Sequence, residues 1–136
     1  MCRFVLYLGE DPALLSAILV RPANSLIHQS RESAMGATAL NADGFGVGWY
    51  APGDPVPGLF RSVQPAWADA NLEEMARHIH SPLFIAHVRA TTGTPVQQTN
   101  CHPFRHENWL WAHNAKLSGL RTVPDGMVRV QGLKVN

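Results

Sequence analysis

The chain has 136 residues, of which 46% are hydrophobic and 15% are charged, and this composition is typical of one globular domain rather than a disordered chain. Eleven Lys and Arg residues nearly balance ten Asp and Glu residues, which gives a formal net charge of +1. That balance argues against a protein that binds nucleic acid or a membrane surface through charge. We therefore expect neither a nucleic-acid partner nor a membrane partner.

The N-terminus and the cysteines bear on the compartment. The apolar run Phe4–Leu8 meets Glu10 and Asp11 before it reaches the length of a secretory signal. Cys2 and Cys101 are the two cysteines, and one possible pair is too few for a disulfide framework. We therefore expect a cytoplasmic protein with reduced thiols.

The first forty residues predict a strand, a short helix and a long loop. Cys2–Leu8 is apolar and rich in residues that favour strands. Asp11 followed by Pro12 has the pattern of a helix start, so a helix is predicted over Ala13–Val20. Residues 21–41 show no clear hydrophobic period and predict a long loop with room for one more helical turn.

The next segment, Asp43–Tyr50, alternates glycine with bulky residues and predicts a strand with one nearly bare face. Such a face is typical of a strand whose backbone is closely approached by another segment. The glycine spacing does not match a dinucleotide-binding fingerprint and no helix follows, so phosphate binding is not predicted. Leu59–Val63 predicts the returning strand.

Three further elements complete the predicted order. Asn71 and Glu74 resemble a capping box, and the apolar stripe that follows predicts a helix ending near His80. Pro82–Val88 and Trp109–Asn114 predict two strands separated by a loop. The order β, α, β, β, α, β, β favours a layered α+β fold over an all-α or all-β fold.

Seven histidines raise the question of a metal site. His78 and His80 would lie on different faces of a helix end, and their spacing does not fit the known ligand patterns. Cys101 and His102 adjoin in one loop, which leaves open a third interpretation as a metal or redox site. We expect no metal and no cofactor.

Cys2 is the most informative position for chemistry. Removal of Met1, which is common when the next residue is small, would place the α-amino group of Cys2 beside its own thiol. An α-amino group has a reference pKa of about 7.7–8.0 and is therefore a base near neutral pH. Such a cysteine is a nucleophile that carries its own base. The alternative is a small apolar residue buried at the start of a strand.

Two polar positions could serve this nucleophile. Asn114 ends an apolar strand, and its side-chain amide could form an oxyanion-stabilising pair with the N–H of Ala115. Arg89 follows a buried strand and suits a carboxylate, with the hydroxyl of Thr92 in the same loop. The alternatives are a turn-forming asparagine and an arginine in a surface ion pair.

Five short motifs occur in a fixed order along the chain. They are Met1-Cys2-Arg3-Phe4, Asn41-Ala42-Asp43-Gly44-Phe45-Gly46, Ala86-His87-Val88-Arg89, Thr99-Asn100-Cys101-His102-Pro103-Phe104 and Ala112-His113-Asn114. With these motifs in register, the chain resembles class II glutamine amidotransferases from residue 2 to near residue 117. It is similar to their stand-alone branch, which includes γ-glutamyl hydrolases.

The resemblance implies the N-terminal nucleophile hydrolase fold, a layered αββα sandwich, here with its C-terminal part missing or abbreviated. It implies one incomplete glutamine amidotransferase type-2 domain over residues 1–136. It also implies an amidohydrolase in which Cys2 forms a thioester while cleaving the γ-amide of glutamine or of a γ-glutamyl conjugate.

Six site residues follow from the resemblance. They are Cys2, Asn114 and Ala115 for catalysis, and Arg89, Thr92 and His102 for substrate binding. The family pattern has glycine where this chain has Ala115, and family members continue beyond the length of this chain. These departures keep a second interpretation open, an inactive or truncated fold that acts as a binding module. The implied partner is a small-molecule substrate, and a homodimer or a synthetase partner is left open.

Overall fold

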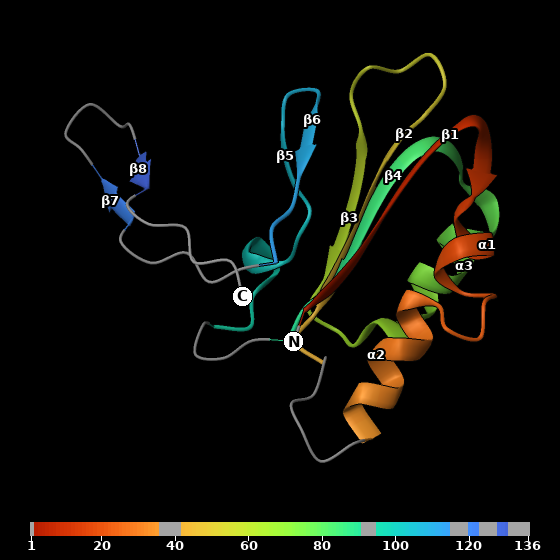
Figure 1. Cartoon of the computed structure of the whole chain (residues 1–136), viewed down its shortest axis with the longest axis horizontal. Coiled ribbons are helices and arrows are strands. Elements are labelled where there is room, and N and C mark those ends of the chain that lie inside the picture. The colour runs from red at the N-terminus through yellow and green to blue at the C-terminus, as the bar shows by residue number, and fades with distance from the viewer. Residues whose placement is uncertain (1, 36–41, 91–94, 115–119, 123–127, 131–136) are drawn as a thin grey trace.

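A computed structural model describes residues 2–35, 42–90, 95–114, 120–122 and 128–130. It shows a mixed α+β fold, as the sequence predicts, and its sheets are antiparallel (Figure 1). Its helices are α1 (Leu15–Leu19), α2 (Leu26–Met35) and α3 (Ala70–His78), with the 3-10 turns η1 (Ala66–Ala68) and η2 (Gln98–Asn100). Its strands are β1 (Arg3–Leu14), β2 (Phe45–Tyr50), β3 (Gly58–Ser62), β4 (His80–Val88), β5 (Phe104–His106), β6 (Trp109–Trp111), β7 (Leu120–Thr122) and β8 (Val128–Val130).

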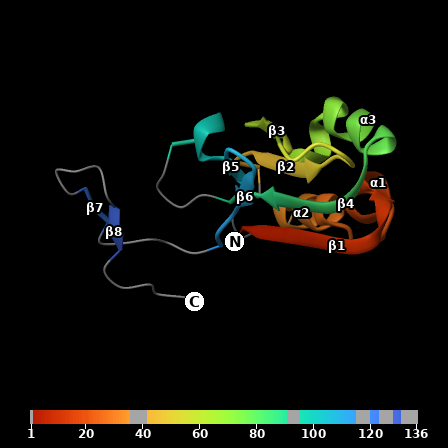
Figure 2. The same ribbon diagram turned by 90° about the horizontal axis from the view of Figure 1, so that it is seen from above.

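Four strands form the central sheet in the order β1-β4-β2-β3, and all neighbours are antiparallel. The pairing of Arg3 with Val88 sets the register of β1 against β4. The start of β1 therefore lies beside the end of β4, as Figure 2 shows. This alignment places the residue before β1 next to the residues after β4.

β1 is longer than predicted, and the predicted helix start is wrong. The register shifts between Leu8 and Ala13, so a bulge takes up the four residues between them and pairing with β4 resumes beyond it. Because that pairing keeps the chain extended, Asp11 and Pro12 do not begin a helix. α1 begins only at Leu15, and its N-terminus has no side-chain cap.

α2 occupies much of the segment that the sequence predicted to be a loop, so that prediction is wrong there. The backbone N–H of His28 donates to the hydroxyl oxygen of Ser25 at 3.2 Å, a contact typical of an N-cap. Ser30 is fully buried and donates to the carbonyl oxygen of Ile27 at 2.6 Å. Since a serine takes an inward position beside Leu26 of the core, the apolar period is interrupted and the helix is hard to recognise.

α3 confirms the predicted helix, although its cap lies two residues earlier. One carboxylate oxygen of Asp69 accepts the backbone N–H groups of Asn71 and Leu72 at 3.0 and 3.1 Å. The predicted capping pair of Asn71 and Glu74 is therefore wrong. A carboxylate at this position also interacts favourably with the positive end of the helix dipole.

The three helices lie on one face of the central sheet, and the core fills the space between them (Figures 1 and 2). The buried side chains from the sheet are Phe45, Val47, Phe84, Ala86 and Val88, and those from the helical segments are Leu15, Leu19, Leu26, Ala66, Leu72 and Ala76. In the described parts of the chain, no helix is long and apolar enough to cross a membrane.

The opposite face of the sheet is covered over β2. A Cβ atom added to Gly46 would collide with the carbonyl oxygen of His102, and one added to Gly48 would lie 2.7 Å from the Leu110 side chain. The bare strand face predicted from the glycine alternation is thereby confirmed. The segment around His102 and the hairpin of β5 and β6 are what approach it.

Over β1, the same face is not covered by the described residues. Phe4, Leu6 and Leu8 are 53%, 57% and 77% exposed. β1 is also at the edge of its sheet in the described structure. Within the described part of the chain, the sheet therefore presents an apolar margin along β1 that no other segment covers.

The segment between β4 and β6 holds more structure than the predicted loop. It contains η2 and β5, and β5 pairs with β6 in an antiparallel hairpin. β6 confirms the strand predicted over Trp109–Asn114, although only its first three residues are paired. β7 and β8 form another antiparallel hairpin, which the sequence did not predict.

Candidate active site

Cys2 lies directly before β1, beside the residues that follow β4. Its thiol and Ala90 make two contacts of 3.3 Å: the sulfur donates to the carbonyl oxygen of Ala90, and the backbone N–H of Ala90 donates to the sulfur. The first contact suits a thiol and the second can stabilise negative charge on sulfur. The side chain is half-buried, so the sulfur is held in place at a partly open position.

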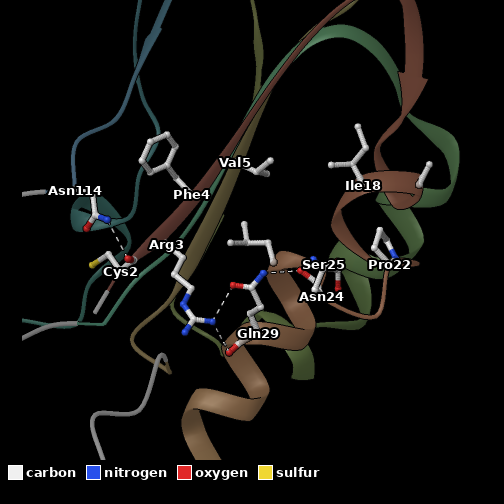
Figure 3. Close-up of a pocket in the computed structure, with 12 residues that line it drawn as sticks. Cys2, Arg3, Phe4, Val5, Ile18, Pro22, Asn24, Ser25, Gln29 and Asn114 are labelled. Atoms are coloured by element: carbon white, nitrogen blue, oxygen red, sulfur yellow. Dashed lines mark hydrogen bonds between the residues drawn. The ribbon is translucent and has the colours of Figure 1, made fainter.

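Asn114 lies three residues after β6 in the sequence and next to Cys2 in space. Its side-chain nitrogen donates to the main-chain oxygen of Cys2 at 3.0 Å (Figure 3). The structure therefore brings together two of the sequence-predicted site residues that are 112 positions apart. Their catalytic roles stay predictions.

Arg89 is buried at the end of β4, only 5% exposed. Its guanidinium nitrogens Nη1 and Nη2 donate to the carbonyl oxygens of Asp43 at 3.4 Å and Pro95 at 3.2 Å, and its backbone N–H donates to Gly44. The surface ion pair considered as an alternative does not fit a buried side chain. These contacts hold the guanidinium group inside the fold, one residue before the Ala90 that contacts the sulfur of Cys2. The binding of a carboxylate by Arg89 stays a prediction.

The other predicted site residues differ in how far the structure describes them. Thr92 and Ala115 lie outside the described residues. His102 is only 8% exposed, and neither of its ring nitrogens has a hydrogen-bond partner in the described part of the chain. Burial, assisted by the charges of His113 and Arg89, lowers the pKa of His102 to about 4, so its ring is neutral near pH 7. Its substrate contact stays a prediction.

A pocket of about 640 Å³ lies between β1 and the helices α1 and α2 (Figure 3). Its lining residues are Cys2, Arg3, Phe4, Val5, Ala17, Ile18, Pro22, Asn24, Ser25, Leu26, Gln29 and Asn114. Arg3 Nη1 donates to the main-chain oxygen of Gln29 at 3.1 Å and to its side-chain oxygen at 3.0 Å, which ties β1 to α2. The sulfur of Cys2 points away from Arg3 and Gln29, toward Ala90.

Cys101 is fully buried and differs from Cys2 in its surroundings. Its sulfur donates to the carbonyl oxygens of Ser62 at 3.4 Å and Gln97 at 3.7 Å. Burial raises the pKa of this thiol, which keeps it protonated and unreactive. Among the described residues, no group of three or more His, Cys, Asp or Glu side chains is placed to hold a metal ion. These observations do not favour the metal or redox interpretation of Cys101 and His102.

Sequence analysis did not identify His87 as a functional residue. His87 is part of β4, its side chain is 1% exposed, and its ring packs against the ring of His102. Burial, followed by the charges of His102, His113 and Arg89, lowers its pKa to about 3. The signal available in the sequence was a single histidine in the otherwise apolar run Pro82–Val88, because histidine is buried less often than the apolar residues around it.

Comparison with known proteins gives consistent matches along most of the chain. The family model described as glutamine amidotransferases class-II matches residues 15–132. A probable glutamine amidotransferase of Saccharomyces cerevisiae, DUG3, is 38% identical over 130 residues, which cover 90% of this chain and 36% of DUG3. The γ-glutamyl-hercynylcysteine sulfoxide hydrolase of Mycobacterium tuberculosis is 33% identical over 115 residues, which cover 84% of this chain and 48% of that enzyme.

A solved structure adds a match in three dimensions. It is a glutamine aminotransferase class-II domain protein from Silicibacter pomeroyi, with a TM-score of 0.57 and 31% sequence identity, covering 88% of this chain and 38% of that one. The chain thus spans less than half the length of each of these three proteins. The family match over residues 15–132, together with the structural match, shows that this chain belongs to the class II glutamine amidotransferases.

Proposed function

We propose that the chain carries the nucleophile of an amidohydrolase, which cleaves the γ-amide of glutamine or of a γ-glutamyl conjugate through Cys2. The names of its relatives, a probable glutamine amidotransferase and a γ-glutamyl hydrolase, support this substrate class. Removal of Met1 is part of the proposal, because it frees the α-amino group that acts as the base.

In the acylation step, the α-amino group of Cys2 takes the thiol proton and the sulfur attacks the γ-carbonyl carbon of the substrate. The side-chain amide of Asn114 and the N–H of Ala115 stabilise the oxyanion that forms. The C–N bond then breaks, the proton moves to the leaving nitrogen, and ammonia or an amine departs. A glutamyl thioester remains on Cys2.

In the second step, the same amino group takes a proton from water, and the resulting hydroxide attacks the thioester. Glutamate leaves and the thiol is restored, so the two steps balance without a cofactor. Arg89 is proposed to bind the α-carboxylate of the glutamyl group, with Thr92 beside it. The position of Arg89 directly before Ala90, whose main chain contacts the sulfur of Cys2, supports this role.

One observation carries the proposal: the sulfur of Cys2 lies 3.3 Å from the backbone N–H of Ala90, and the amide of Asn114 lies at the carbonyl oxygen of Cys2. A cysteine that only filled the core would not need an amide side chain from the other end of the fold beside it. The arrangement supplies a nucleophile and a donor within one small region at the end of the sheet.

The remaining expectations belong to the same proposal. The chain is proposed to form one glutamine amidotransferase type-2 domain over residues 1–136, part of an αββα sandwich of the N-terminal nucleophile hydrolase type. It is proposed to act in the cytoplasm on a small-molecule substrate. Hydrolysis itself requires neither a synthetase partner nor a homodimer, and glutamate release by the purified chain alone would show that the reaction proceeds without a synthetase.

The test measures glutamate release from glutamine and from several γ-glutamyl amides. Wild type is compared with Cys2→Ala and with Cys101→Ala, which removes the other thiol. We expect turnover to be abolished in Cys2→Ala and retained, per folded molecule, in Cys101→Ala. Intact-mass analysis should show the loss of Met1, and a diazoketone analogue of glutamine should label Cys2.

Two results would contradict the proposal. Glutamate release by Cys2→Ala at the wild-type rate would assign the chemistry to another residue. A chain that retains Met1, resists labelling at Cys2 and releases no glutamate would not be a hydrolase.

The second candidate function is a non-catalytic binding module, and the uncovered side chains of Phe4, Leu6 and Leu8 favour it. An exposed apolar margin on an edge strand is typical of a surface that associates with another copy of the chain. Gel filtration together with the glutamate-release assay distinguishes the two candidates, because a monomer that turns over glutamine excludes the binding module.

A further inference from the structure

Three histidine rings lie in contact on the face of the sheet opposite the helices. The rings of His87 and His102 have centroids 4.5 Å apart with planes at 52°, and those of His102 and His113 are 4.4 Å apart at 83°. We call His87, His102 and His113 the histidine stack. His102 is its middle member and touches both of the others.

The histidine stack is built on the bare stripe of β2. Gly46 pairs with His87 across the sheet, and its missing side chain leaves room for the main chain of His102. On the outer side, the ring of Phe104 packs against His102 at 4.5 Å and 68°. The stack is thus enclosed by the sheet on one side and by the β5–β6 hairpin on the other.

The buried rings are not explained by hydrogen bonding. Both ring nitrogens of His87 and both of His102 are inaccessible and have no hydrogen-bond partner among the described residues. Phenylalanine would fill such sites at a lower desolvation cost, and both imidazoles pack against other rings. The inaccessible nitrogens also leave His102 poorly placed to contact a substrate directly.

His113, at the end of the histidine stack opposite His87, adjoins the candidate active site. His113 directly precedes Asn114, whose side-chain nitrogen lies 3.0 Å from the main-chain oxygen of Cys2. β6 ends two residues before His113, so the described pairing of β6 with β5 does not extend to this stretch. The ring of His113 contacts the ring of His102, with centroids 4.4 Å apart, and lies less close to the ring of Trp111, at 6.4 Å.

We propose that His102 is a positioning residue, which holds Asn114 beside Cys2 through its ring contact with His113. This inference rests on the proposed function, in which Asn114 stabilises the oxyanion. It replaces the substrate contact that the sequence predicted for His102 with an indirect role. His87 serves as the fixed support of the stack, because it is part of the central strand of the sheet.

The first experiment compares the kinetics of His102→Ala and His102→Phe in the full chain. An oxyanion donor acts in the transition state, and removing one costs about 100- to 1,000-fold in kcat. We therefore expect His102→Ala to lower kcat by about 10- to 100-fold while KM changes by less than about threefold. His102→Phe keeps a ring between its neighbours and should recover most of that loss. His106→Ala, on the exposed end of β5, is the matched control.

A double-mutant comparison separates positioning from a general structural role. If His102 acts through Asn114, then His102→Ala should have no further effect on kcat in an Asn114→Ala background. Equal losses of kcat in the two backgrounds would overturn the proposal. Thermal melts of every variant keep the comparison to folded protein.

A third measurement does not depend on turnover. The side-chain amide signal of Asn114, assigned by its absence from the spectrum of Asn114→Ala, should shift or broaden in His102→Ala and stay in place in His106→Ala. An unchanged signal in folded His102→Ala would overturn the positioning role even if the chain is an active hydrolase. Absence of glutamate release by wild type, with the shift present, would overturn the proposed function and leave the positioning contact standing.

Discussion

The two faces of the central sheet are used differently. On the face toward the helices, side chains such as Phe84 and Val47 are fully buried in a continuous apolar core. On the other face, the backbone of β2 is bare, a loop packs directly against it, and β1 leaves Leu8 exposed. Because side chains alternate along a strand, each strand contributes to both faces.

One strand can therefore contribute both to the apolar core and to the site. In β4, Phe84 and Ala86 belong to the core, while His87 belongs to the histidine stack on the opposite face. Substitutions on the helix face should therefore change mainly the free energy of unfolding. Substitutions on the opposite face should also change the geometry at Asn114.

The largest expected effect is on the helix face. Phe84→Ala removes a fully buried ring that stacks on Tyr7 with centroids 5.3 Å apart, and should lower the free energy of unfolding by about 3–5 kcal/mol. Ile85→Ala, the next residue on the opposite and less buried face, should cost about 1–2 kcal/mol. Urea unfolding measures both, and equal losses would mean that the two faces do not differ.

Acid should lower the free energy of unfolding through a buried histidine of the opposite face. His87 is neutral in the folded chain, with a pKa of about 3, whereas an unfolded histidine binds a proton below about pH 6.5. The unfolded state therefore binds more protons as pH falls from 6.5 toward 3. The contribution of this residue should therefore lower the free energy of unfolding by about 1.4 kcal/mol for each pH unit of that fall.

His87→Phe isolates this contribution. Its free energy of unfolding, measured between pH 7 and pH 4.5, should fall less steeply than that of wild type, by the slope assigned to one histidine. His106→Gln, which replaces an exposed histidine, is the matched control. A His87→Phe curve parallel to wild type would show that His87 is not held neutral by burial.

A smaller loss is expected where the loop packs on β2. Gly46→Ala places a Cβ against the main-chain oxygen of His102, which cannot rotate away, and should cost about 1–3 kcal/mol with a loss of kcat. A Cβ at Gly48 would meet side chains rather than main chain, the end of Leu110 at 2.7 Å and the ring of Pro103 at 3.0 Å, so Gly48→Ala should be milder. The comparison fails if Gly48→Ala is the more damaging change in urea unfolding and kinetics.

The smallest change in stability is expected at the uncovered margin of β1. Leu6→Thr combined with Leu8→Thr keeps residues that favour strands and should alter the free energy of unfolding by less than about 0.5 kcal/mol per site. It should nevertheless reduce self-association in sedimentation experiments, because the apolar patch is smaller. If wild type is already monomeric at high concentration, this margin does not drive association.

Much of the fold could be predicted where composition is strong and contacts are local. The alternating glycines of β2 and the apolar stripe of α3 were recognised in the right places. The end of β1 was not, because pairing with β4 keeps Asp11 and Pro12 extended against their local preference. α2 was missed because the buried Ser30 interrupts its apolar period.

The site could be predicted only in part, for a related reason. Chemistry and family resemblance predict Cys2, Arg89 and Asn114 as site residues, and the structure brings Asn114 and Cys2 together. The histidine stack joins residues from three segments, in β4, before β5 and after β6, and no periodicity relates them. Such a contact depends on the sheet register and on the missing side chain at Gly46, and both are tertiary features.

The bulge in β1 has a consequence for engineering. The four residues Gly9–Pro12 leave the ladder between Leu8 and Ala13, while the pairing of Arg3 with Val88 is kept at the other end of the strand. Glu10, Asp11 and Pro12 are exposed, so a short insertion here would lengthen a protrusion rather than shift the strand. This position suits a peptide tag or a fluorophore, because it is insulated from the alignment of Cys2 with Ala90.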